Sequence, residues 1–341
     1  MVFPGGMMSG AKLQGEIVKK YLEKYPMMPS LTIAKLIYNE NPKVYRNVEN
    51  VRKLIRYYRG RNGKKSRSNL ATRDFLLPAP TKENPYSLPE FDTTNYTPYH
   101  VPADLRRGLI IADLHVPYTC KSALEIAIAD AVKFGIDFII ILGDFLDCYH
   151  LSRFEKDPRV RQFRSEIDIG KHLLCVLRKQ FPEAHIILKE GNHDRRYEDY
   201  LLTHAPQLIG FEEYRLSVLL DCFNLGIDWV GDKRVIYSGK LNCIHGDEYW
   251  KAVSSPANPA RTAFLRSKAS TLMAHHHQSS EHTESDIRGD IITCWSLGCL
   301  CDLHPHYMPL NKWNLGYALI EKDSQGNFQV DNKRIWQGKP L

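Results

Sequence analysis

The amino-acid sequence predicts an α/β domain preceded by a small all-α module. Apolar runs of strand length recur through residues 108–341, and each is followed by polar residues. Residues 1–75 show apolar residues at helical spacing instead. A proline-rich segment, residues 76–107, separates these parts, and such a composition favours an extended, semi-rigid linker. The sequence therefore predicts two folded parts joined by a linker.

The N-terminal module is expected to contain three helices. Prolines at 26, 29 and 42 interrupt the helical pattern, and Gly60 ends it. Ser30 and Asn47 are the residue types that cap helix N-termini, and we expect them to precede the second and third helices. The predicted helices span residues 13–25, 31–39 and 48–59.

The module is strongly basic. Residues 1–75 hold 16 Lys and Arg against 5 Asp and Glu, a net charge of +11, whereas the whole chain is +7, which leaves −4 for the remainder. Three arginines recur along the third helix, and two lysines follow in a basic arm: Arg52, Arg56, Arg59, Lys64 and Lys65. The pattern resembles a helix-turn-helix module that grips nucleic-acid phosphates. We expect DNA as the partner, with RNA or a docked protein as alternatives.

Five polar clusters follow the strand-like runs of the larger part. They are Asp113-Leu114-His115, the Gly143–Asp147 segment, Gly191-Asn192-His193-Asp194, His245-Gly246-Asp247 and His275-His276-His277. Gaps of 31, 48, 53 and 30 residues separate Asp113, Asp144, Asn192, His245 and His275, so a helix fits between most strands. Because ligands gather at the carboxyl ends of strands in α/β sheets, the clusters are expected to converge.

The clusters have the composition of a transition-metal site. Asp, His and Asn together suit Mn, Fe, Ni or Zn better than Ca or Mg, and we expect Mn. One aspartate between two ligand sets can bridge two divalent metal ions. Two ions about 3.5–4 Å apart are suited to hydrolysing phosphate esters.

The order of these motifs resembles the calcineurin-like metallophosphoesterase superfamily. Its signature is D-x-H, G-D-x-x-D, G-N-H-D/E, a lone His and G-H-x-H, and the chain departs from it visibly only at Ala274, where the family usually has Gly. The resemblance implies a four-layer α/β/β/α sandwich. Strand-like segments at residues 291–297, 313–320 and 328–336 would complete its second sheet.

The resemblance also implies residue roles. Asp113, His115 and His277 would hold one metal ion; Asn192, His245 and His275 would hold the other; Asp144 would bridge them. A hydroxide shared by the ions would attack phosphorus, and His193, oriented by Asp147, would protonate the leaving oxygen. Arg195 or Arg196 could contact substrate phosphate.

Three functions remain open from the sequence: a DNA phosphodiesterase or nuclease, a phosphomonoesterase with a protein-docking module, and a DNA-binding protein with an inactive domain. The complete ligand motifs disfavour the third. Cys148 stands where protein phosphatases carry Arg after G-D-x-x-D, which disfavours the second.

No signal peptide, membrane span or Cys-x-x-Cys pair is evident, so we expect a cytoplasmic protein with free thiols. The combination of modules resembles phosphoesterases of phages and prophages.

Overall fold

A computed structural model describes most of the chain, and it divides into two compact units. The units are Met1–Thr94 and Asn95–Leu341, and their boundary falls within the segment that we expected to be a linker. Each unit has its own apolar core. The described residues are 10–25, 28–62, 81–94, 96–153, 162–249 and 257–341.

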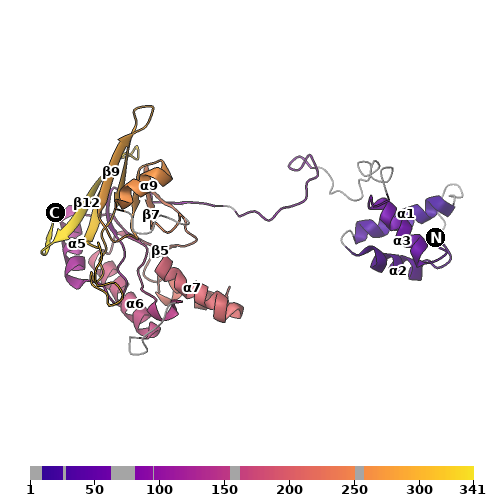
Figure 1. Ribbon diagram of the computed structural model, residues 1–341, viewed down its shortest axis with the longest axis horizontal. Helices are drawn as coiled ribbons and strands as arrows, with labels where there is room; N and C mark the ends of the chain where they lie inside the picture. The colour runs from indigo at the N-terminus through magenta and orange to yellow at the C-terminus, as the bar shows by residue number, and fades with distance from the viewer. Residues whose placement is uncertain (1–9, 26–27, 63–80, 95, 154–161, 250–256) are drawn as a thin grey trace. The chain divides into compact units, whose positions relative to one another are not determined.

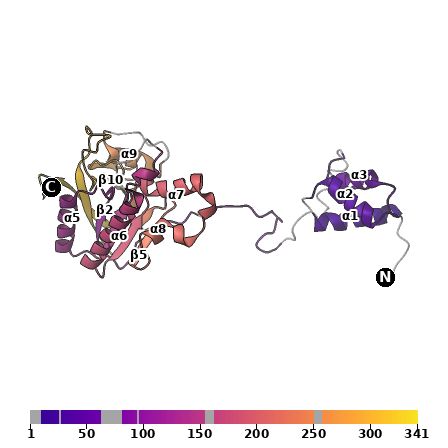
Figure 2. The same cartoon turned by 90° about the horizontal axis from the view of Figure 1, so that it is seen from below.

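The first unit contains a bundle of three helices, as the sequence predicted (Figure 2). They are α1 (Gly10–Lys24), α2 (Ser30–Glu40) and α3 (Val48–Tyr58). Apolar residues at helical spacing meet in its centre, where Leu22, Ile33 and Ile55 are fully buried. The apolar periodicity is therefore what holds this unit together.

The helix ends show why these boundaries occur. Asn47 caps α3, because its side chain accepts a hydrogen bond from the Asn50 N–H at 2.9 Å. Ser30 is the first residue of α2 instead of its cap, and Pro29 takes the cap position. Just past α3, the Arg59 guanidinium donates to Ser30 Oγ at 2.9 Å and to the Met28 carbonyl at 2.6 Å. Arg59 thereby ties the end of α3 to the start of α2.

The second unit is built on two sheets. The seven-stranded sheet has the order β13 (Lys339–Pro340), β12 (Phe328–Trp336), β11 (Leu315–Lys322), β2 (Arg107–Ile111), β3 (Phe138–Leu142), β4 (His185–Lys189) and β5 (Ile227–Val230). The six-stranded sheet has the order β1 (Tyr99–His100), β6 (Ile236–Ser238), β7 (Leu241–Ile244), β8 (Thr271–Met273), β10 (Ile291–Ser296) and β9 (Ser280–Ser285).

One expectation about strand pairing was wrong. The segments that form β11 and β12 were expected in the second sheet, but β11 pairs antiparallel with β2 and so extends the first sheet. The burial of β11 explains this position. Tyr317 and Leu319 pack in the core under the helices, whereas Ala318 and Ile320 pack in the core between the sheets. A strand covered on both faces belongs inside a sandwich.

Helices complete four layers, as the resemblance implied (Figure 1). The outer face of the seven-stranded sheet packs against α5 (Lys121–Phe134), α6 (Phe163–Gln180), α7 (Asn192–His204) and α8 (Leu216–Leu219). The six-stranded sheet packs against α9 (Pro259–Ser267). Short 3₁₀ helices are η3 (Tyr149–Leu151), η4 (Pro206–Leu208) and η5 (Glu212–Tyr214). Among the described residues, no helix is both long and apolar enough to cross a bilayer.

Candidate metal centre

The five polar clusters meet where strands of both sheets end. In the first sheet β2, β3 and β4 are parallel neighbours, so their carboxyl ends lie at one edge. In the second sheet β7 and β8 are also parallel neighbours. Hydrogen bonds join the loops of the two sheets directly, since the His275 N–H donates to Asp113 Oδ2 at 3.1 Å and His245 Nδ1 lies 2.9 Å from the Leu142 carbonyl. The two sheets thus present their loops to one shared site.

The first expected ligand set is assembled and buried. His277 Nε2 lies 3.4 Å from Asp113 Oδ1 and 3.2 Å from His115 Nε2. The other nitrogen of His115, Nδ1, lies 2.9 Å from Asp147 Oδ1. A proton on Nδ1 would therefore be held by Asp147, and the lone pair of Nε2 would be directed at the space shared with His277.

The second expected set lies beside it. His245 Nε2 is 3.2 Å from Asn192 Oδ1, and the rings of His245 and His275 are 5.1 Å apart. His245 Nδ1 lies 2.9 Å from the Leu142 carbonyl, which fixes the tautomer and leaves Nε2 as the coordinating atom. Asn192 is the first residue of α7, whereas His245 and His275 lie in the loops that follow β7 and β8.

Asp144 stands between the two sets. Its Oδ2 lies 3.2 Å from His245 Nε2 and 3.8 Å from His115 Nε2, while Oδ1 accepts the His193 N–H at 2.8 Å. Burial by itself would raise the pKa of Asp144, but His245 and His193 hold that pKa well below its usual value. Burial would likewise lower the pKa of His245, yet Asp144 raises it to about 10. The carboxylate is thus ionised and positioned to serve both sets.

The donor atoms fit two divalent transition-metal ions. Asp113 Oδ1 and His275 Nδ1 are buried and make no hydrogen bond among the described residues. Such buried polar atoms are costly unless something else satisfies them. Histidine nitrogens combined with carboxylate and amide oxygens are the ligands of Mn, Fe, Ni and Zn sites. Three groups of side chains among the described residues are close enough to share a metal ion: Asp144, His245 and His275; His115, His277 and Cys301; and His115, Asp144 and His193.

The backbone at the site is strained and closely packed. Five of the seven expected ligands adopt positive φ, between 45° and 69°: Asp113, His115, Asp144, His275 and His277. Two motif glycines allow the loops to approach. A Cβ on Gly143 would lie 2.3 Å from His245 Nδ1, and one on Gly191 would lie 2.2 Å from the Asp144 nitrogen. Glycine is required in these motifs because a neighbouring ligand occupies the space of a side chain.

His193 and Asp147 form a pair at the edge of the centre. His193 Nδ1 lies 3.1 Å from Asp147 Oδ1 and 3.0 Å from the Asp147 carbonyl. His193 also falls in a cluster with His115 and Asp144. However, its Nε2 lies 2.9 Å from the Arg196 guanidinium. A nitrogen that faces a cation is poorly placed to bind a metal ion, so the geometry is consistent with the expected role outside the ligand sets.

The two arginines after His193 have different surroundings. Arg196 Nη1 donates to the Asp147 carbonyl at 3.0 Å, and its Nη2 approaches His193. Arg195 instead points away into an ion-pair cluster, where Nη1 donates to Asp247 Oδ2 at 2.7 Å and Nε lies 3.6 Å from Glu190. Of the two arginines that were expected to contact phosphate, Arg196 lies beside His193 and Arg195 does not.

Sequence reasoning missed Asp194, which positions the loops. Its carboxylate is fully enclosed and accepts the N–H groups of Phe145, Leu146 and Gly191 at 2.8–3.2 Å. It therefore joins the G-D-x-x-D loop to the start of α7. Its place in the G-N-H-D motif was the available signal. His276, which lies between two expected ligands in the sequence, is half-buried beside His275 and falls in none of the clusters formed by the described residues.

The expected nucleic-acid residues lie in the first unit. Arg56 is exposed, and Arg52 pairs with Glu49 at 3.3 Å on the surface of α3. Arg59 is engaged with α2 as described above, so the structure gives it partners other than phosphate. Lys64 and Lys65 lie outside the described residues.

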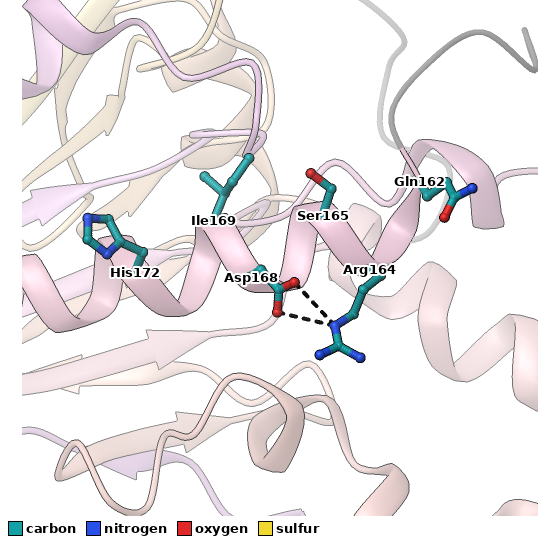
Figure 3. A pocket seen from close by; sticks show the side chains of 6 residues that line it. All are labelled: Gln162, Arg164, Ser165, Asp168, Ile169 and His172. Carbon is teal, nitrogen blue, oxygen red and sulfur yellow. Dashed lines mark hydrogen bonds and ion pairs between the residues drawn. The ribbon is translucent and has the colours of Figure 1, made fainter.

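Two hollows in the second unit differ in their relation to the metal centre. One of about 610 Å³ runs along α6, where an exposed Arg164–Asp168 ion pair of 3.2 Å occupies one side (Figure 3). It contains none of the expected ligands, and Arg164 is paired with Asp168 there. A second, of about 400 Å³, is bordered by His115, Asp147 and His277. Of these two hollows, the second is the one that lies beside the expected metal ligands.

Comparison with known proteins identifies the family. The model of the calcineurin-like phosphoesterases matches residues 107–299, more than half of the chain. The gene 54 proteins of Mycobacterium phages L5 and D29 are 25% identical over 254 residues and 24% identical over 256 residues, and each alignment covers 68% of this chain and 99% of the relative. Both relatives are encoded by phages, as the combination of modules led us to expect.

Solved structures show weaker similarity. Vacuolar protein sorting 29 from Cryptosporidium parvum matches with a TM-score of 0.38 and 14% identity, covering 70% of this chain and 96% of that one. YfcE, a phosphoesterase from E. coli, matches with a TM-score of 0.31 and 14% identity, covering 62% and 87%. From the family match and the assembled site, the chain belongs to the calcineurin-like phosphoesterases and is a metal-dependent phosphoesterase.

Proposed function

We propose that this protein is a phosphodiesterase that acts on DNA. The observation that carries the proposal is the small number of cations that the described residues place around His193. Arg195 is committed to Asp247, and Cys148, a buried neutral thiol, follows Asp147. Arg196 is left as the guanidinium beside the proposed acid. A phosphodiester carries one negative charge where a monoester carries up to two, so a site with few cations favours the diester.

The ligand sets described above would hold two divalent ions, with Asp144 shared between them. When bound, such a pair lowers the pKa of water and stabilises the attacking and leaving oxygens of an in-line displacement. We propose Mn as the metal, with Fe, Ni and Zn as alternatives, because imidazole nitrogens and carboxylate oxygens suit these ions.

His193 is positioned to handle the proton of the leaving group. With Nδ1–H donated to Asp147, its Nε2 accepts from Arg196 in this structure. A phosphate that drew the guanidinium toward itself would free Nε2 to carry a proton. His193 would then deliver that proton to the leaving oxygen, while Asp147 stabilises the charged ring.

The helical unit would deliver the enzyme to DNA. The net charge of +11 on residues 1–75 and the exposed Arg56 favour a polyanionic partner. RNA and a docked protein remain the alternatives. All eight cysteines are unpaired, which is consistent with a reducing compartment, and the cytoplasm is the location that we propose.

A metal-by-substrate panel tests the proposal. Protein loaded with Mn, Ni, Zn or Mg is assayed on bis-p-nitrophenyl phosphate, p-nitrophenyl phosphate, single- and double-stranded DNA, and RNA. We expect Mn to support faster cleavage of the diester than of the monoester, together with DNA cleavage. A strong preference for p-nitrophenyl phosphate without DNA cleavage would instead establish a phosphomonoesterase.

A further inference from the structure

The hollow of about 400 Å³ beside the metal centre has walls that are mostly aromatic. Its volume lies in the range of small-molecule sites, which is roughly 300–1,000 Å³. His115 and His277 form the end of the hollow at the expected metal ligands. Four further aromatic side chains line it, Tyr118, Tyr149, Tyr307 and Trp313, together with Asp147, Cys301, Asp302, Pro305 and His306.

The aromatic side chains are attached directly to the metal-centre loops. The Trp313 and His277 rings are 4.2 Å apart, and the Asn314 N–H donates to the His277 carbonyl at 2.9 Å. Tyr118 follows His115 in a turn closed by a hydrogen bond of 2.7 Å from the Tyr118 N–H to the His115 carbonyl. The aromatic surface therefore adjoins His115 and His277, two of the expected ligands of the first metal.

The segment that carries Tyr307 is held in place by its own hydrogen bonds. Asn311 Nδ2 donates to the carbonyls of Leu303 and Met308 at 2.7 and 2.9 Å. At its start, the Asp302 N–H donates to the Tyr118 carbonyl at 2.8 Å. Yet the Tyr307 side chain is 65% exposed. A loop that is fixed by its own hydrogen bonds and leaves an aromatic ring largely exposed presents that ring to a ligand in a defined position.

Tyr307 and Trp313 offer two faces to a flat ligand. Their ring centroids are 6.5 Å apart and their planes are inclined by 66°, so the two rings form a corner and do not stack on each other. Asp302 and His306 supply polar groups along the edge of the same hollow. Aromatic walls with a few polar groups at the rim match a nucleobase, which has an apolar face and a hydrogen-bonding edge.

We propose that this pocket, defined by Tyr118, Tyr149, Tyr307 and Trp313, binds the nucleobase of the nucleotide whose phosphate lies at the metal centre. The proposal rests on the phosphodiesterase function proposed above and adds a subsite to it. Stacking tolerates any base, since every base has a π-face. The pocket would therefore select nucleotides over other phosphodiesters without reading a sequence.

The test compares two diesters that share a leaving group. Thymidine 5′-(p-nitrophenyl phosphate) carries a base, whereas methyl p-nitrophenyl phosphate does not, and both release p-nitrophenolate. The measured quantity is the ratio of their kcat/KM values for the Mn-loaded full-length protein. Tyr307→Ala should lower this ratio about tenfold, the order of the loss of one base-stacking contact, while Tyr307→Phe keeps the ring and the ratio. Leu310→Ala is the matched control, because Leu310 is 92% exposed in the same loop and does not line the pocket.

Binding without turnover gives an independent readout. Thymidine 5′-monophosphate should quench the tryptophan fluorescence of the metal-free protein more strongly than ribose 5-phosphate, and Trp313→Phe should remove the difference. Equal quenching by both ligands, or equal kcat/KM for both diesters in the wild type, would overturn the nucleobase pocket while leaving a phosphodiesterase. Base-dependent quenching without hydrolysis of either diester would instead support the pocket and reject the proposed reaction.

Discussion

Asp147 Oδ1 lies 3.1 Å from His193 Nδ1, and the same oxygen lies 2.9 Å from His115 Nδ1. One carboxylate atom thus orients both a proposed metal ligand and the proposed general acid. Burial would raise the pKa of Asp147, but the hydrogen bonds from His115 and His193 hold it below its usual value. An ionised Asp147 couples the position of the acid to the position of the metal.

Replacing His193 should separate metal binding from chemistry. We expect His193→Ala to keep two metal ions and to lose roughly 10²–10⁴-fold in turnover, the usual contribution of general acid catalysis. The loss should be smaller for a p-nitrophenolate leaving group than for an alkoxide, because p-nitrophenolate needs less protonation. Metal analysis and rates on both kinds of diester measure this. Loss of the metals in His193→Ala would show that the residue is a ligand.

Gly191 should tolerate no side chain. A Cβ there would lie 2.2 Å from both the nitrogen and Oδ1 of Asp144, so Gly191→Ala must displace the shared carboxylate. We expect a stability loss of about 1–3 kcal/mol from overpacking, together with weaker binding of both metals. Thermal unfolding and metal titration report the two effects. Gly10→Ala serves as control, since Gly10, like Gly191, has no positive φ, but no atom lies within 4 Å of the added Cβ. Unchanged metal affinity in Gly191→Ala would count against the packing described here.

Glu166 should make stability depend on pH. Burial and the nearby Asp147 raise the pKa of this α6 carboxyl to about 8, from an ordinary 4.5. The folded state therefore binds a proton more tightly than the unfolded state, so the stability that this proton provides is complete below pH 4.5 and is lost as pH rises to 8. Glu166→Gln keeps an acceptor for the Cys148 N–H, which Glu166 binds at 2.8 Å.

Melting temperatures of Glu166→Gln and wild type, measured from pH 5 to pH 8, check this expectation. The melting temperature of the variant should rise relative to that of the wild type as the pH increases through this window. Parallel curves would mean that Glu166 titrates normally.

Removing the basic segment should weaken DNA binding but leave the rate of hydrolysis at the metal centre unchanged. Residues 1–75 carry a net charge of +11 and none of the proposed ligands. The truncated protein should keep its rate on a small diester but bind long DNA far more weakly and with a smaller salt dependence, because fewer counterions are released. Fluorescence-polarisation salt titrations of both proteins measure this. Equal affinity of the two proteins for DNA would leave the helical unit as a docking or packing element.

Local patterns in the sequence predicted the elements that position the site. The apolar run before the Gly143–Asp147 cluster forms β3, which is buried along its whole length, because buried parallel strands consist of continuous apolar residues. The run before His245 forms β7 although it includes Asn242. Each run ends directly before its polar cluster, so the convergence of the clusters followed from the general rule for α/β sheets.

Pairings between distant segments could not be predicted in this way. β11 has the same apolar character whether it joins β2 or the second sheet, and only the packing of both its faces decides. Arg195 precedes Arg196 in the sequence, yet its 2.7 Å bond to Asp247, 52 residues away, turns it from the site. The aromatic pocket likewise combines side chains from loops about 200 residues apart, Tyr118 and Tyr307 among them.

Manganese binding to the wild type and to Asp144→Asn tests the shared metal centre most directly. Asp144 contacts His245 at 3.2 Å and His115 at 3.8 Å, so its charge should serve both ions. Isothermal titration should give two ions per wild-type chain, and electron paramagnetic resonance should show them magnetically coupled. Asp144→Asn should lose both ions, while Asp168→Asn on the exposed face of α6 retains them. One ion per wild-type chain, or two coupled ions in Asp144→Asn, would contradict a centre built around this carboxylate.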